Sequence, residues 1–91
     1  MERDATYRFR AGDHVHHAPS GEDWVLACDQ NRDDVQPAGW PETLARASDC
    51  ALIRAASEAE RMDMLTKVAA IRFPDYRGSV ARDQLAREEK P

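Results

Sequence analysis

The sequence predicts an α+β fold in which about five short antiparallel strands form a small closed barrel and one or two helices follow. Two observations carry this prediction. Up to Ile53, short apolar stretches alternate with turn residues and show no helical period, which is typical of short strands. From Ser57 onward, the apolar residues recur at helical spacing. We expect one domain of 91 residues, with a barrel over 7–54, a helix over 57–72 and a shorter helix over 79–89.

The strands are predicted from alternation and turn chemistry. His14–His17 is a first strand, closed by the turn residues 19–22. Residues 24–28 form the strongest strand, with Trp24, Leu26 and Cys28 on one face. Residues 31–34 make a polar hairpin turn, and Pro37 moves the third strand, which starts at Val35, to an edge or a bulge. Residues 43–47 fit a strand or a helical turn, and residues 50–53 fit a last strand.

The first helix has a clear start. Ser57 and Glu60 have the spacing of a capping box, and Pro74 is expected to end the helix near Arg72. Ser79 is expected to cap the second helix. One stripe of the first helix is apolar and should face the core or a second copy, so both a monomer and a homodimer stay open; its members are Met64, Leu65, Val68 and Ile71.

Composition excludes several classes of protein. The apolar runs are far shorter than the roughly 20 residues of a membrane span, and the polar N-terminus lacks the apolar stretch of a secretory signal. Two cysteines, Cys28 and Cys50, are too few for a disulfide framework and are expected to be small core residues. We therefore expect a cytoplasmic protein.

Acidic residues are concentrated in the middle of the chain. The whole chain carries a net charge of −4, whereas the segment from Asp13 to Asp49 holds eight acidic and two basic residues. A concentrated negative field repels nucleic-acid phosphates and attracts basic protein surfaces. The alternative is a solvated surface that only aids solubility.

Two stretches carry a resemblance to known proteins. Residues 9–15, with their Gly12-Asp13 turn, and residues 19–25 resemble the opening of SH3-like barrels of the Tudor and KOW type. The chain also resembles small phage and prophage proteins of proteobacteria, through residues 39–42 and 48–50. The barrel resemblance implies a binding module. The phage resemblance implies an inhibitor of host defence, of which anti-CRISPR proteins are one class.

The predicted function is therefore protein binding without catalysis or a cofactor. No nucleophile motif or phosphate-binding glycine loop is present in the sequence. We expect acidic loops to dock on a basic partner, such as a nucleic-acid-binding host protein, with an exposed tryptophan as apolar anchor. The expected contact residues are Glu22, Asp23, Asp29, Asp33, Asp34 and Trp40.

Three other uses of the chain remain open. The tail could bind nucleic acid through Arg72, Arg77, Arg82 and Arg87. His14 and His16, on one strand face, could share a metal with Cys28 and Cys50. Aromatic residues could form a cage for a methylated lysine or arginine; the candidates are Tyr7, Phe9, Trp24 and Trp40.

Overall fold

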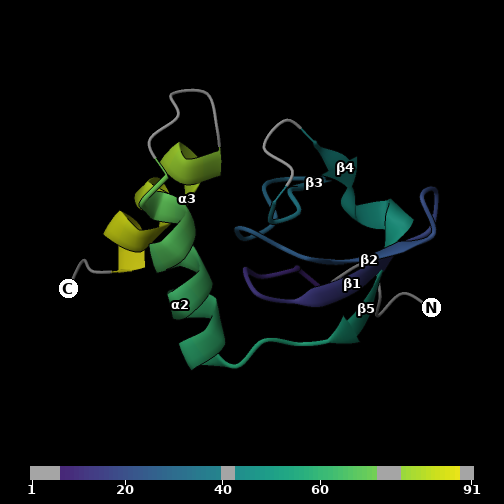
Figure 1. Cartoon of the computed structure of the whole chain (residues 1–91), viewed down its shortest axis with the longest axis horizontal. Coiled ribbons are helices and arrows are strands. Elements are labelled where there is room, and N and C mark those ends of the chain that lie inside the picture. The colour runs from purple at the N-terminus through teal and green to yellow at the C-terminus, as the bar shows by residue number, and fades with distance from the viewer. Residues whose placement is uncertain (1–6, 40–42, 72–76, 89–91) are drawn as a thin grey trace.

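A computed structural model describes residues 7–39, 43–71 and 77–88. Its architecture is α+β, as predicted, with the strands in one part of the molecule and two helices side by side in the other (Figure 1). In chain order the elements are β1 (His14–His17), β2 (Glu22–Val25), β3 (Asp34–Val35), β4 (Ala45–Arg46), the 3₁₀ turn η1 (Ala47–Asp49), β5 (Cys50–Arg54), α2 (Glu58–Ala69) and α3 (Arg77–Glu88).

The strands form two small antiparallel sheets. β1 is the central strand of the first sheet, in the order β2-β1-β5, and β3 pairs with β4 in the second. A bridge between Leu26 and Pro37 links the two sheets. In the described residues the strands therefore do not close into the expected barrel.

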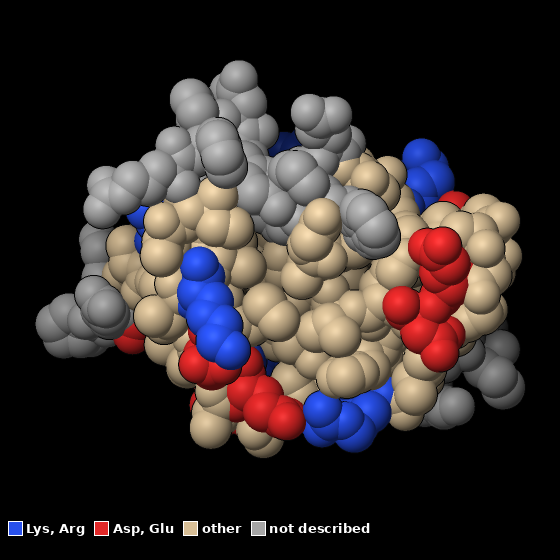
Figure 2. Space-filling model, viewed as in Figure 1, with Lys and Arg blue, Asp and Glu red and all other residues tan. Residues whose placement is uncertain are grey.

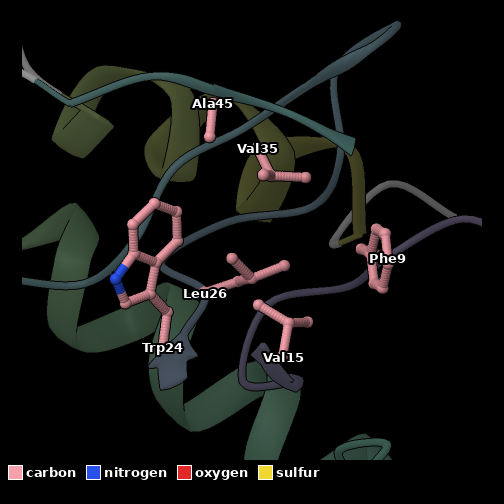
Figure 3. Close-up of a cluster of buried hydrophobic side chains, with 6 residues drawn as sticks. All are labelled: Phe9, Val15, Trp24, Leu26, Val35 and Ala45. Atoms are coloured by element: carbon pink, nitrogen blue, oxygen red, sulfur yellow. The ribbon is translucent and has the colours of Figure 1, made fainter. Parts of the chain in front are cut away.

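The residues directly opposite one another in the first sheet share a face. Trp24, Val15 and Leu52 form one row, and Asp23, His16 and Ala51 form a row on the opposite face. The Trp24 face packs on the core between the two sheets (Figure 3); the members of that core are Phe9, Val15, Trp24, Leu26, Val35 and Ala45. Trp24 is therefore a core residue.

A second core joins the helices to the strands. Leu65 and Val68 of α2 are buried there, and the half-buried Met64 and Ile71 pack against the cluster, so the predicted stripe of α2 does face a core. The buried members are Ala11, Ala27, Cys28, Leu65, Val68 and Ala81. The predicted burial of Cys28 is confirmed, although it lies in this second core and not beside Trp24.

The turn at Gly12 and Asp13 connects the strands to the start of α2. Gly12 has a φ of 86°, and a Cβ there would lie 3.1 Å from Cβ of Ala56. Asp13 is fully buried. Its carboxylate accepts hydrogen bonds from the Tyr7 hydroxyl (2.8 Å), the Arg10 amide (3.0 Å) and the Ala56 amide (2.8 Å). The buried carboxylate therefore fixes the end of the segment that follows β5.

Local signals predicted the start of α2 better than its end. Ser57 and Glu60 form the expected capping box, in which each side chain bonds the other residue's amide. The helix ends at Ala69, before Arg72, where the Arg82 guanidinium donates to the carbonyls of Ala69 and Ile71. Orphan carbonyls at a helix end need such donors.

Other predicted boundaries shift. β2 starts at Glu22 and ends at Val25, because the chain then changes its pairing partner and the Ala27 amide donates to Gln36. Residues 43–47 contain β4 and the start of η1, so both readings of that segment are partly right. α3 begins at Arg77, so Ser79 is not its N-cap.

No helix in the described ranges is long and apolar enough to cross a membrane.

Candidate protein-docking surface

The 3₁₀ turn η1 brings three acidic segments to one end of the molecule. The Ala18 amide, in the β1–β2 turn, donates to the Asp49 carbonyl at 3.0 Å, and the Ala47 amide donates to the Asp33 carbonyl at 2.7 Å. The two ends of η1 therefore hold two different turns. We call the residues gathered here the acidic end; they are Glu22, Asp23, Asp33, Asp34 and Asp49.

Figure 2 shows a group of acidic side chains at the right-hand end of the molecule, where the strands lie. Uncharged residues fill the middle of this view, basic side chains border the acidic group above and below, and mixed basic and acidic side chains lie over the helices (Figure 2). The acidic side chains at this end are thus grouped in space, with basic side chains at their margin.

Carboxylates on the helices have basic partners, whereas most at the acidic end do not. Asp63 pairs with Lys67 (3.1 Å), Asp83 with Arg87 (3.4 Å) and Glu60 with Arg54 (3.2 Å). Within the described ranges, no basic side chain lies in ion-pair distance of Glu22, Asp33, Asp34 or Asp49. Asp23 contacts Nδ1 of His16 at 2.8 Å. The acidic end therefore carries charge that no ion pair with a described lysine or arginine compensates.

Arg32 and Arg46 reduce the charge of this region, and neither forms an ion pair with another described residue. Asp34 lies opposite Arg46 in the β3–β4 ladder, and both arginines are exposed. The five acids of the acidic end and these two arginines leave a net negative charge there. The surface is acidic with a basic margin.

Asp29 does not belong to this surface, contrary to the sequence prediction. Its Oδ1 and Oδ2 accept from Nε and Nη2 of Arg61, at 3.1 and 2.6 Å, and Oδ1 also accepts from the Ala11 amide. Burial by itself would raise the pKa of Asp29, but the Arg61 hydrogen bonds and the Ala11 amide hold the pKa below its ordinary value. Asp29 is therefore an internal anion that ties α2 to the β body, by which we mean the described residues between Tyr7 and Arg54.

Arg61 is a buried charged residue that the sequence did not single out. Its side chain is 5% exposed and also contacts Glu58 (3.2 Å) and Glu88 (3.0 Å). The hydrogen bonds that Arg61 donates to Asp29 and Glu88 raise its pKa above the ordinary arginine value. One signal was available: Arg61, Leu65 and Val68 lie at i, i+4 and i+7 on one helix face. Its role is structural, since three carboxylates from three segments already surround it.

The histidines do not form a metal site with the cysteines. His14 and His16 share a strand face, as predicted, but Cys50 lies opposite His17 in the ladder and so belongs to the other face. Burial raises the pKa of the Cys50 thiol, which disfavours a metal-binding thiolate. No group of three metal-ligating side chains occurs among the residues that the structure describes.

Of the four aromatic residues considered for a cage, the three that the structure describes do not assemble one. Phe9 and Trp24 are buried in the first core, and the Trp24 ring is stacked on His17 with ring centroids 4.0 Å apart. Tyr7 meets Phe9 edge to face at 5.4 Å. Trp40, the expected apolar anchor, lies outside the described residues.

The arginines proposed for nucleic-acid binding are partly engaged within the fold. Arg82 closes the end of α2, and Arg87 pairs with Asp83. Arg72 and the side chain of Arg77 lie outside what the structure describes. The described part of the tail therefore offers less basic surface than its sequence suggests.

The sequence matches no known family model, and comparisons with curated proteins and with solved structures found no match.

Proposed function

We propose that this chain is a non-enzymatic protein-binding module whose acidic end docks on a basic protein surface. The observation that supports it is the contrast in pairing. Acids on α2 and α3 are matched by lysine or arginine, whereas Glu22, Asp33, Asp34 and Asp49 have no basic partner among the described residues. Like charges held close together repel one another and oppose folding, so their grouping at one end favours a role in binding.

The set of contact residues changes from the sequence prediction. Asp29 leaves the set because Arg61 already neutralises it, and Asp49 joins because η1 places it between the two acidic turns. The proposed partner is a basic protein surface of the kind that binds nucleic acid. A module with such a partner could be an inhibitor of a host defence nuclease, encoded by a phage or prophage.

We also infer that the β body is an open member of the SH3-like barrels. A continuous path of pairing supports this: β5 pairs with β1, β1 with β2, the end of β2 with residues 36–38, and β3 with β4. Such barrels serve as binding modules, in agreement with the docking function.

A pair of matched charge reversals tests the docking function. The first variant, Glu22→Lys with Asp33→Lys, changes the acidic end. The second, Asp63→Lys with Asp83→Lys, makes the same change in net charge on the helices. Each tagged chain is used to capture basic proteins from a host lysate at low salt, and the affinity of each recovered protein is then measured as salt is raised.

We expect the first variant to lose affinity by roughly tenfold or more relative to the second, and the wild-type affinity to fall with salt. Equal losses in both variants would mean that only net charge matters and would refute docking through the acidic end. A gel shift with DNA at low salt tests the competing function. A retarded band that is still seen with the first variant would favour nucleic-acid binding by the tail.

A further inference from the structure

β5 is the most exposed of the strands that the structure describes, and no described strand pairs with one of its edges. β1 pairs with its inner edge, and no named strand pairs with its outer edge. Leu52 is 41% exposed and Ile53 is 54% exposed. An edge that presents apolar side chains and unpaired backbone groups is a template for a further strand.

The ladder with β1 determines which backbone groups face outward. Antiparallel pairs alternate between those that exchange hydrogen bonds and those that do not. The Ala18 amide donates to the Asp49 carbonyl, so Asp49 and Ala51 direct their backbone groups toward β1. Leu52 therefore directs its N–H and C=O away from β1, toward the open edge.

The row of side chains that includes Leu52 is buried except at that edge. Trp24 and Val15, its two neighbours in the row, belong to the first core, and Leu52 continues the row to the outside of the sheet. A register irregularity beyond Val15 affects only the last part of β5. The apolar row is thus cut off at Leu52, where another leucine in register would extend it.

The two ends of β5 differ in charge, and this favours an antiparallel neighbour of the same sequence. Asp49 precedes the strand and has no basic partner in the described ranges, while Arg54 ends it. Arg54 uses three of its five N–H groups on Glu60 and His14, and its side chain is 53% exposed. It therefore keeps donors for one more carboxylate.

We propose that two copies of this chain pair their β5 strands antiparallel about a two-fold axis at Leu52. Each Leu52 then exchanges two backbone hydrogen bonds with the other copy's Leu52, and the row becomes Trp24, Val15, Leu52 and the same three residues reversed. Arg54 of each copy lies opposite Cys50, beside Asp49, of the other. The resulting sheet has the order β2-β1-β5-β5-β1-β2.

Apart from Asp49, which lies beside Arg54 of the other copy, the residues of the acidic ends stay free in this arrangement, and the two ends lie apart. Each acidic end lies beyond the N-terminal end of its own β5, so antiparallel pairing places the two at opposite ends of the joint. Five residues of strand span about 17 Å, which exceeds the screening length of about 8 Å at physiological salt. The pairing therefore does not depend on the docking function, and it gives a bivalent module.

The α2 stripe is not an alternative surface for a second copy. Leu65 and Val68 are buried within the chain, and α2 packs against α3. Among the described residues, β5 presents two adjacent exposed apolar side chains, Leu52 and Ile53, for self-association.

Sedimentation velocity of the full chain over a wide concentration range tests the proposal. We expect a dimer for the wild type and loss of the dimer in Leu52→Lys, because the axis brings the two ammonium groups together. The control is Leu44→Lys, a leucine that is 56% exposed and lies outside β5, which should remain dimeric. Circular dichroism confirms that each variant is folded.

Cross-linking tests the register separately. In a Cys50→Ser background, Leu52→Cys should form a disulfide-linked dimer on mild oxidation, since the opposed Cα atoms of such a pair lie about 5.5 Å apart. Leu44→Cys in the same background should not. A wild-type chain that stays monomeric at all concentrations, or a dimer that withstands Leu52→Lys, would overturn the proposal.

Discussion

The buried pair of Arg61 and Asp29 gives the sharpest test of what holds the helices to the strands. The change is Arg61→Ala, which removes a guanidinium that contacts both oxygens of Asp29 as well as Glu58 and Glu88. Of the hydrogen bonds that the Asp29 carboxylate accepts, the variant would keep only the one from the Ala11 amide. The variant therefore leaves a half-buried carboxylate without its cation.

The expected magnitude follows from the burial of the pair. Removing one partner of a buried ion pair costs about 3–5 kcal/mol, and because the Asp29 side chain is 26% exposed we take the lower value, about 3 kcal/mol. A domain of this size is stabilised by about 5–14 kcal/mol in total. Loss of about 3 kcal/mol would lower the melting temperature by about 12–24 °C.

Urea denaturation followed by circular dichroism measures the free energy of unfolding, with two comparison variants. Arg87→Ala removes an arginine from an exposed helix pair with Asp83 and should cost less than about 1 kcal/mol. Arg61→Lys keeps a charge but cannot form the two-pronged contact, so it should fall between the two. If Arg61→Ala costs no more than Arg87→Ala, the pair does not hold the fold as described.

The remaining predictions concern the turn, the helix cap and pH. Gly12→Ala should destabilise the chain by at least about 1–2 kcal/mol, because of its left-handed φ and the nearby Ala56, and Ser57→Ala should cost about 1 kcal/mol; thermal unfolding measures both. Partial burial and the hydrogen bond to Asp13 raise the pKa of Tyr7 to about 12, so one phenol should titrate there by ultraviolet absorbance and disappear in Tyr7→Phe. The folded pKa of Asp29 lies below its unfolded value of 3.8, so its contribution is complete above that value and is lost as pH falls through the folded pKa. Stability should therefore fall less in acid for Arg61→Ala than for the wild type.

Features with local causes were predictable from the sequence. The strand at His14–His17, the turn at residues 31–34 and the capping box at Ser57 each depend on residues within a few positions of one another. Their signals are complete within one window of the chain. The α+β class followed from the same windows.

Features with distant causes were not predictable in this way. Asp29 resembled an exposed loop acid because its partner Arg61 is 32 positions away. Asp13 counted toward the acidic field, although the amide that fixes it belongs to Ala56, 43 positions away. The acidic end itself required η1 to bring Asp33 and Asp49 together. Charge counts located the acidic segment, and only tertiary contacts separated its internal anions from its surface anions.

The contact between Asp13 and Ala56 has a consequence for how the chain folds. β1 pairs with β5, and the buried Asp13 carboxylate beside β1 accepts a hydrogen bond from the Ala56 amide, 43 positions later. The sheet therefore forms only when a long loop of chain has closed. Non-local pairing of this kind slows folding, whereas a helix such as α2 forms from local contacts in about a microsecond. We therefore expect α2 to fluctuate as a nascent helix before the sheet exists. The rate-limiting step is then the meeting of β1 with β5, which brings Ala56, just before α2, to the Asp13 carboxylate.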